Sequence, residues 1–151
     1  MIVAFFGHAQ FTVKTEYESR LISILEETIG IQKADIYLGG YGEFDAFAYR
    51  CCQKYKATHP DISLVLVTPY ITKSYQENRL IHEKDRYDAL LYPPIEDKPL
   101  RFAITYRNQW MVEQADVIIM GITHTWGGAY KTYQYAKRKK KKTINLTGEA
   151  L

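Results

Sequence analysis

Two groups of glycines are the residues of this sequence best suited to bind a charged ligand. Gly39, Gly40 and Gly42 form the first group, and Gly127 and Gly128 form the second. Each group follows a short apolar run and precedes a segment with helical spacing. A glycine accepts a positive φ and lets a phosphate approach the backbone N–H groups, and a helix that begins there adds unpaired donors and its positive dipole end. We therefore predict that both groups bind a phosphate-bearing ligand; the alternative is that they only permit tight turns.

Polar side chains near the same points of the chain could complete such a site. Gly7 and His8 follow the first apolar run, where a neutral imidazole can bind a base, a ribose or a phosphate, or can simply pack at a turn. Arg107 is a candidate phosphate ligand because its planar guanidinium binds two oxygens at once. Thr125 and Thr132 place hydroxyl groups on either side of the second glycine group. We predict that these residues also bind the ligand.

Two carboxylates, Glu43 and Asp45, follow the first glycine group directly. An N-glycosidase needs such a group to stabilise an oxocarbenium-like centre or to act as a nucleophile, so both are candidate catalytic residues. The favoured interpretation is that they are acidic residues in the first turn of a helix, where the dipole alone favours them, and that Asp45 binds backbone amides or a ligand hydroxyl. Tyr41 and Trp126 could stack on a base, or serve as lid or interface aromatics.

The sequence lacks the patterns of several common cofactor sites. Cys51 and Cys52 are adjacent, and neighbours on a helix diverge by roughly 100°, so we expect two buried thiols without a disulfide. Neither Cys-x-x-Cys nor a Cys/His cluster with zinc spacing is present. A Walker-type Gly-Lys-Ser/Thr and a full Gly-x-Gly-x-x-Gly after the first apolar run are absent too. We therefore expect no metal and no cofactor, and neither a P-loop hydrolase nor a conventional nicotinamide dehydrogenase.

The net charge is small, with 20 Lys and Arg against 17 Asp and Glu, and much of the excess lies in the run 137–142. Because this run ends a predicted helix, its expected role is a solvated cap that complements the dipole, and nucleic-acid binding is the less favoured alternative. The run Met1–Phe6 lacks the basic region and cleavage site of a signal peptide, and no stretch is long enough to cross a bilayer. We expect a cytoplasmic protein that binds no membrane.

Apolar runs alternate with helical patterns along residues 1–151, which predicts one domain of the α/β class, a Rossmann-like three-layer α/β/α fold with a mostly parallel sheet of about five strands. The expected strands are 2–6, 35–38, 62–67, 116–120 and 143–146, with a possible short strand over 89–92. The expected helices are 15–29, 44–55, 101–115 and 127–138. Residues 70–100 are polar and rich in proline, which predicts an irregular insertion. Ligands of such sheets bind outside the carboxyl ends of the strands, where both glycine groups fall.

Several of these segments together resemble the SLOG superfamily, a Rossmann-like group that contains the LOG-type phosphoribohydrolases and the DprA-like proteins. The matching segments are Arg107–Met111, Ala115–Ile119 and Gly127–Thr132. Val3–His8 and Gly39–Asp45 resemble the small bacterial SLOG proteins of the DUF1273/YpsA type, and the resemblance covers most of the chain apart from 70–100. It implies a nucleotide-type ligand and a homo-oligomer.

The sequence departs from the LOG-type enzymes at one position that matters for catalysis. Arg107 matches their helix arginine, but Gln134 stands where their loop has a catalytic glutamate, and a glutamine cannot act as a charged acid or base. The resemblance therefore implies a sensor or regulatory protein that binds a nucleotide or a nucleotide-derived ligand. One alternative is a nucleotide phosphoribohydrolase or glycosyl-transferring enzyme that uses Glu43 or Asp45. The other is a DprA-like, DNA-associated protein.

Overall fold

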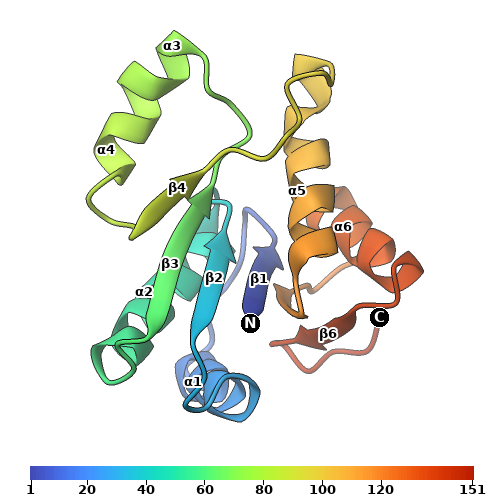
Figure 1. Ribbon diagram of the computed structural model, residues 1–151. Coiled ribbons are helices and arrows are strands. Elements are labelled where there is room, and N and C mark those ends of the chain that lie inside the picture. The colour runs from blue at the N-terminus through green and yellow to red at the C-terminus, as the bar shows by residue number, and fades with distance from the viewer.

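The chain forms a six-stranded sheet in the order β4-β3-β2-β1-β5-β6 (Figure 1). The computed structural model describes residues 1–151. Every neighbouring pair of strands is parallel, as expected of apolar runs that are buried on both faces. The strands are β1 (Ile2–Gly7), β2 (Ala34–Leu38), β3 (Ile62–Val67), β4 (Ala89–Leu91), β5 (Val117–Gly121) and β6 (Lys142–Asn145). The predicted α/β class and the parallel sheet are confirmed, with a sixth strand at the β4 edge.

Helices cover both faces of the sheet and make the three-layer arrangement. They are α1 (Tyr17–Thr28), α2 (Glu43–Ala57), α5 (Ala103–Gln114) and α6 (Gly127–Arg138). Successive residues of a strand point to opposite faces, so Phe5 packs in the core beneath α1 and α2 while Phe6 packs beneath α5 and α6. Cys51 and Cys52 are buried free thiols on α2, as the sequence indicates. No helix has the length and apolar character that crossing a membrane requires.

Phe44, in the first turn of α2, fixes two of the glycines. Gly7 and Gly121 are paired neighbours at the ends of β1 and β5, and the Phe44 ring lies against both. A Cβ would come within 2.1 Å of the ring at position 7 and within 2.2 Å at position 121. Gly7, which we predicted as a ligand-binding residue, therefore has a packing role that explains its identity without a ligand.

Residues 70–100 differ from the predicted irregular insertion. The segment holds a continuous helical stretch, made of α3 (Lys73–Tyr75), a π-helical turn (Gln76–Leu80) and α4 (Ile81–Glu83), followed by strand β4. This stretch and β4 lie together at one edge of the sheet (Figure 1). Leu80, Tyr87 and Ile95 are the few buried apolar side chains of residues 70–100 that belong to the core. The pattern is hard to recognise in the sequence because a short helix at an edge needs only a narrow apolar stripe. The stretch after β4 is an irregular loop up to Pro99.

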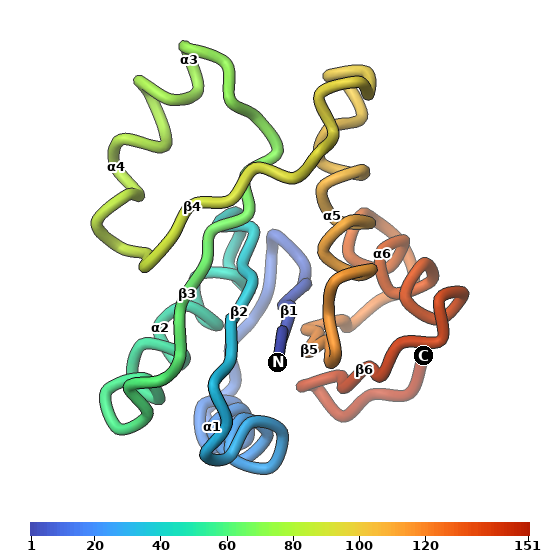
Figure 2. The backbone as a smooth tube through the Cα atoms, viewed as in Figure 1, coloured from blue at the N-terminus to red at the C-terminus, as the bar shows by residue number.

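The strand order reverses at β1, which lies between β2 and β5 (Figure 2). The chain leaves β1 toward α1 on one face, whereas it leaves β5 toward α6 on the other. The connections that follow these two strands therefore run to opposite faces of the sheet. In open α/β sheets such a switch point is the usual place for a ligand.

Candidate functional site

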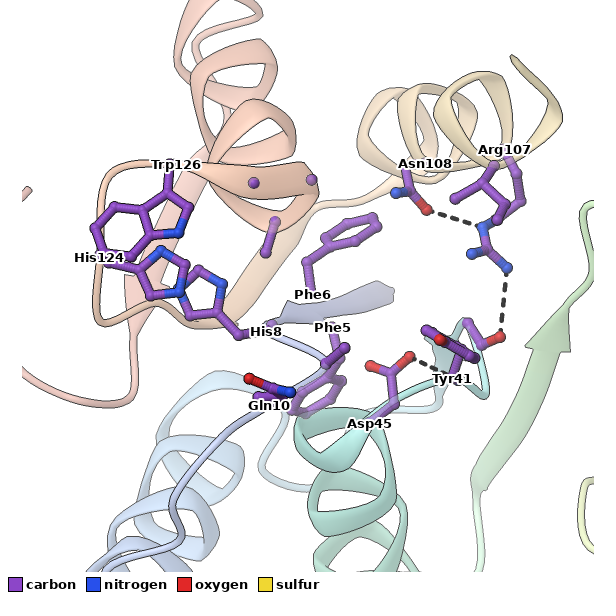
Figure 3. A pocket seen from close by; sticks show the side chains of 17 residues that line it. Phe5, Phe6, His8, Gln10, Tyr41, Asp45, Arg107, Asn108, His124 and Trp126 are labelled. Carbon is purple, nitrogen blue, oxygen red and sulfur yellow. Dashed lines mark hydrogen bonds between the residues drawn. The ribbon is translucent and has the colours of Figure 1, made fainter. Parts of the chain in front are cut away.

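A cavity of about 500 Å³ lies at this switch point. Its 17 lining residues come from the end of β1, the loops after β1, β2 and β5, the first turn of α2, the first half of α5 and the start of α6 (Figure 3). Asp45 and Arg107 are the charged side chains among them. The cavity therefore lies at the edge of the sheet that the sequence predicts, and the fold decides which of the predicted residues meet there.

The start of α6 forms an open wall of the cavity. Gly127 is the first helical residue and has φ +88°, and no side chain caps the helix, because the preceding residue is Trp126. Gly128 is exposed, and a Cβ at this position would meet nothing within 4 Å. The first amide groups of a helix have no intrahelical acceptor, so those of α6 are available to a ligand. Both glycines line the cavity, as the sequence predicts.

The other glycine turn is held by the rest of the protein. Gly40 has φ +70°, and its carbonyl oxygen accepts a hydrogen bond from the Arg79 guanidinium. Gly42 has φ +93°, and a Cβ there would lie 2.7 Å from the Cα of Ala9. Of the three glycines only Gly39 lines the cavity. Gly40 and Gly42 therefore shape the loop that supports the site and lie outside its surface.

Arg107 is a buried side chain that donates hydrogen bonds to the backbone at the carboxyl ends of β2 and β3. It is 5% exposed, and its Nη1 donates to the carbonyl oxygens of Val67 at 2.7 Å and Gly39 at 3.4 Å. Its Nε donates to Asn108 Oδ1 at 2.8 Å. Burial lowers the pKa of Arg107, and nearby Asp45 works against this shift. A guanidinium stays charged in proteins, so Arg107 brings a fixed positive charge to the cavity wall, although two of its nitrogens already serve the protein.

Asp45 is the carboxylate that reaches the cavity. Its Oδ2 accepts a hydrogen bond from the Tyr41 amide at 3.2 Å, and no protein donor contacts Oδ1. Burial raises the pKa of Asp45 to about 6, while the Tyr41 amide and the Arg107 charge oppose the rise. Glu43 is placed differently, because its Oε2 accepts from the Phe11 amide at 2.9 Å and it does not line the cavity. Of the two candidate catalytic carboxylates, only Asp45 could touch a bound ligand.

A stack of aromatic rings forms the wall opposite Arg107 (Figure 3). His8 lies against His124 with ring centroids 3.6 Å apart, and His124 lies against Trp126 at 3.8 Å. His8 is 6% exposed, whereas Trp126 is 67% exposed. Burial lowers the pKa of His8, and His124 lowers it further. The sequence indicates His8 and Trp126 but gives no local signal for His124. His124 lies in the loop after β5, and loops that follow the strands of such sheets are where ligands bind.

The two predicted threonines lie outside the cavity. Thr132 is buried, and its Oγ1 donates to the Gly128 carbonyl at 3.0 Å, so it stabilises the first turns of α6. Thr125 is exposed. Asn108 lines the cavity beside Arg107, and neither its spacing nor its type singled it out in the sequence. No group of three His, Cys, Asp or Glu side chains is placed to hold a metal ion.

The basic run lies at the other end of the sheet. It follows the last turn of α6 and enters β6, so it sits at the amino edge of the parallel strands, away from the cavity. Lys141 Nζ donates to the carbonyl oxygens of Glu113 at 3.0 Å and Ala115 at 3.1 Å, which caps the end of α5. The predicted cap concerned the end of α6, whose last turn holds Lys137 and Arg138, whereas Lys141 caps α5. The run is separate from the candidate site.

Comparisons with known proteins show what the chain is similar to. The DNA processing protein A of Helicobacter pylori, solved in a study of its single-stranded DNA binding mode, matches with a TM-score of 0.61 and 16% identity over 95% of this chain. This chain spans 63% of that protein's chain. A protein of unknown function from Aquifex aeolicus, AQ665, has a TM-score of 0.37 and 16% identity over 95% of this chain and 88% of that chain. No family model and no curated protein matches the sequence. The first likeness supports the Rossmann-like fold.

Proposed function

We propose that this protein binds a nucleotide or a nucleotide-derived ligand in the switch-point cavity, as a sensor or regulatory protein of SLOG type. The observation that carries the proposal is the uncapped start of α6, where Gly127 and Gly128 leave open space against unpaired amides. An anionic group is stabilised at such a point by hydrogen bonds and by the helix dipole. A phosphate there lies within a cavity large enough for a small ligand.

The other cavity walls suit the remaining parts of a nucleotide. The free Oδ1 of Asp45 can accept hydrogen bonds from ribose hydroxyls. Trp126 and Tyr41, which are 67% and 71% exposed, offer aromatic faces for a base. Arg107 contributes positive charge from the cavity wall. Membership of the SLOG superfamily and self-association are part of this proposal, and light scattering of the purified protein checks the second.

Substitutions at Gly128 test the phosphate site with little disturbance of the fold. Gly128→Asp places a carboxylate where an anion is proposed to bind, and Gly128→Asn has nearly the same shape without the charge. The position has space for either side chain, and an acidic residue in the first turn favours the helix. We expect Gly128→Asp to abolish thermal stabilisation by nucleoside monophosphates, whereas Gly128→Asn retains at least part of it. Equal binding by both variants, or no binding by the unmodified protein, would contradict the proposal.

An enzyme is the second candidate, because Asp45 is the single carboxylate of the cavity and its pKa is raised to about 6. A carboxyl group that titrates near neutral pH can act as an acid or a base on a bound ribose. The test is incubation with nucleoside monophosphates and detection of free base. Sustained release of base that Asp45→Asn abolishes would replace the sensor function by N-glycosidic hydrolysis or transfer.

Single-stranded DNA is the third candidate ligand, and the fold likeness to the Helicobacter pylori protein favours it. Exposed Trp126 and Tyr41 could stack on successive bases. Binding of this kind has a steep salt dependence because phosphate contacts release counterions. An electrophoretic or anisotropy titration with an oligonucleotide at several salt concentrations decides, and tight, salt-dependent binding would favour DNA over a mononucleotide.

A further inference from the structure

Asp45 and Arg107 carry opposite charges in the wall of the cavity, yet they do not pair with each other. Arg107 donates from Nε and Nη1 to neutral oxygens, and Asp45 accepts from the Tyr41 amide. No ion pair joins the two side chains. A carboxylate close to a buried guanidinium ordinarily forms a direct and often bidentate pair with it, so this open arrangement requires an explanation.

Each of the two side chains keeps one polar atom free. Nη2 of Arg107 and Oδ1 of Asp45 have no hydrogen-bond partner in the protein. Both atoms remain accessible, since the unpartnered side-chain atoms that are cut off from solvent belong to His8 and His124. Both side chains line the cavity (Figure 3). Arg107 therefore offers donors, and Asp45 an acceptor, to the same ligand.

Gly39 leaves open the space between these two groups. A Cβ at this position would lie 3.2 Å from Nη2 of Arg107 and 3.2 Å from Oδ2 of Asp45. Gly39 is not among the glycines with a positive φ, so its backbone conformation does not require glycine. The absent side chain instead leaves room for a small group of a ligand between the two charges.

The two opposite charges select a neutral group that can both donate and accept. A phosphate at this point would be repelled by the Asp45 carboxylate, and an ammonium group would be repelled by Arg107. A hydroxyl donates to a carboxylate and accepts from a guanidinium. A vicinal diol has two such oxygens side by side, so it can contact Oδ1 and Nη2 together.

A short chain of hydrogen bonds connects this pair with the proposed phosphate site. Arg107 Nε donates to Asn108 Oδ1 at 2.8 Å, and Asn108 Nδ2 donates to Thr132 Oγ1 at 3.5 Å. Thr132 Oγ1 in turn donates to the Gly128 carbonyl at 3.0 Å. Arg107, Asn108 and Gly128 all line the cavity. The phosphate site and the charged pair are therefore adjacent parts of one cavity.

Exposure separates the places for the base and the sugar of a nucleotide. Tyr41 and Trp126 are 71% and 67% exposed, so a base that stacks on either ring lies at the mouth of the cavity. Arg107 is 5% exposed, so a group that contacts its Nη2 lies deeper. The ribose joins the base to the phosphate, and it is the part of a nucleotide that carries a vicinal diol.

We propose that the ribose of the ligand binds between Asp45 and Arg107, with its vicinal hydroxyls donating to Oδ1 and accepting from Nη2, so that the site selects ribonucleotides over deoxyribonucleotides. This inference rests on the proposed function and names the class of nucleotide. It makes DNA a poor ligand of this site, because the sugar of DNA lacks the 2′-hydroxyl and its 3′-oxygen is esterified. Gly39 becomes a residue that determines specificity, since a side chain there would fill the space for the diol.

Matched ligands test the sugar without any change to the protein. The ribonucleoside 5′-monophosphates of adenine, guanine, cytosine and uracil are titrated by calorimetry beside their 2′-deoxy forms and 3′-deoxyadenosine 5′-monophosphate. The pH is 7.5, at which Asp45 is ionised because its pKa is about 6. A site that hydrogen-bonds a hydroxyl rejects an analogue without it, since its polar groups are left unpaired. We expect the loss of either hydroxyl to weaken binding by roughly 10- to 100-fold for every base that binds.

Three substitutions assign this discrimination to particular residues. Gly39→Ala and Asp45→Asn should weaken the binding of the ribonucleotide more than that of its 2′-deoxy form, so that the ratio of the two affinities approaches one. Glu43→Gln is the matched control, because Glu43 is a carboxylate in the same first turn of α2 that does not line the cavity. It should keep the ratio of the unmodified protein. Thermal denaturation checks that each variant is folded.

Equal affinity for ribonucleotides and deoxyribonucleotides would overturn the inference and leave the proposed function standing. Discrimination among bases without discrimination between sugars would do the same, since it would place a base edge between the two charges. A ratio that persists in both Gly39→Ala and Asp45→Asn would also overturn the inference. If no nucleotide binds, the proposed function fails and the inference with it.

Discussion

The two glycine turns look alike in the sequence but differ in the structure. The turn after β2 is held by protein contacts, since Arg79 binds Gly40, Ala9 packs against Gly42 and Arg107 donates to Gly39. In the turn after β5 the two glycines themselves are not packed against another segment, since a Cβ at Gly127 would be 4.0 Å from His124 and a Cβ at Gly128 would meet nothing within 4 Å. Gly42 therefore needs to be glycine for both its φ and its packing, whereas Gly127 needs glycine only for its φ of +88°, and the second turn has spare room and spare donors. Only a turn of the second kind is free to serve a ligand.

Of the substitutions that compare the two turns, Gly42→Ala should lower the free energy of unfolding the most. A small effect would contradict the difference between the two turns. The new Cβ would lie 2.7 Å from the backbone of Ala9, and φ +93° is unfavourable for a residue with a side chain. Strain and overpacking together should lower the free energy of unfolding by about 2–4 kcal/mol. Urea denaturation measures this loss of unfolding free energy. A loss below about 1 kcal/mol would show that the first turn is as adaptable as the second.

Arg107→Met tests the support of the first turn from the other side. The substitution keeps most of the apolar stem but leaves the carbonyl oxygens of Val67 and Gly39 without their donor. We expect a loss of about 2–3 kcal/mol, because buried acceptors remain unpaired. Arg107→Lys is the control, since it retains charge without the planar fork. A stable Arg107→Met variant that no longer binds ligand would mean that Arg107 serves the ligand alone.

Asp45→Asn should change how stability depends on pH. The pKa of Asp45 in the folded protein is about 6, above the ordinary value of about 3.9, so the folded state binds more protons between these values. The free energy of unfolding should therefore fall as the pH rises from about 4 to 6, by about 2 kcal/mol from this group. Asp45→Asn should abolish that decrease while it weakens ligand binding. Denaturation of both proteins across this pH range measures the difference, and parallel curves would contradict the burial of the carboxylate.

Gly128→Ala should have the smallest effect on stability. The position is in the first turn of α6 and has room for a methyl group, so the change should stay within about 1 kcal/mol and can be stabilising, because alanine favours a helix. Thermal denaturation compares it with Gly42→Ala. A large loss would show that the second turn is held as tightly as the first.

Much of the fold can be predicted from the local sequence. Apolar runs such as Ile62–Val67 predict buried parallel strands, and the observed β3 has the same bounds. The helix Gly127–Arg138 is also as predicted, because it starts at a glycine pair and ends at a basic run. Residues 73–83 were missed because their helix lies at the edge of the sheet and buries few side chains.

The candidate site was predictable in position but only partly in composition. Gly39, Asp45 and Arg107 do reach the cavity, as do His8 and the second glycine pair. Glu43 was an equal candidate to Asp45, and only the direction of each side chain separates them. His124 escaped notice because a lone histidine in a loop has no local signature, and its importance comes from a ring that is far away in the sequence.

The sequence by itself determined the class of fold and the edge of the sheet where the glycines gather. Both follow from patterns within short segments, because burial on both faces of a strand and the start of a helix are local requirements. The tertiary structure decided which turn is open, which carboxylate faces the cavity and which rings stack. These depend on contacts between distant segments, such as Phe44 against Gly7 and Gly121, or His8 against His124. No spacing within a segment encodes such contacts, since the order of the strands sets them.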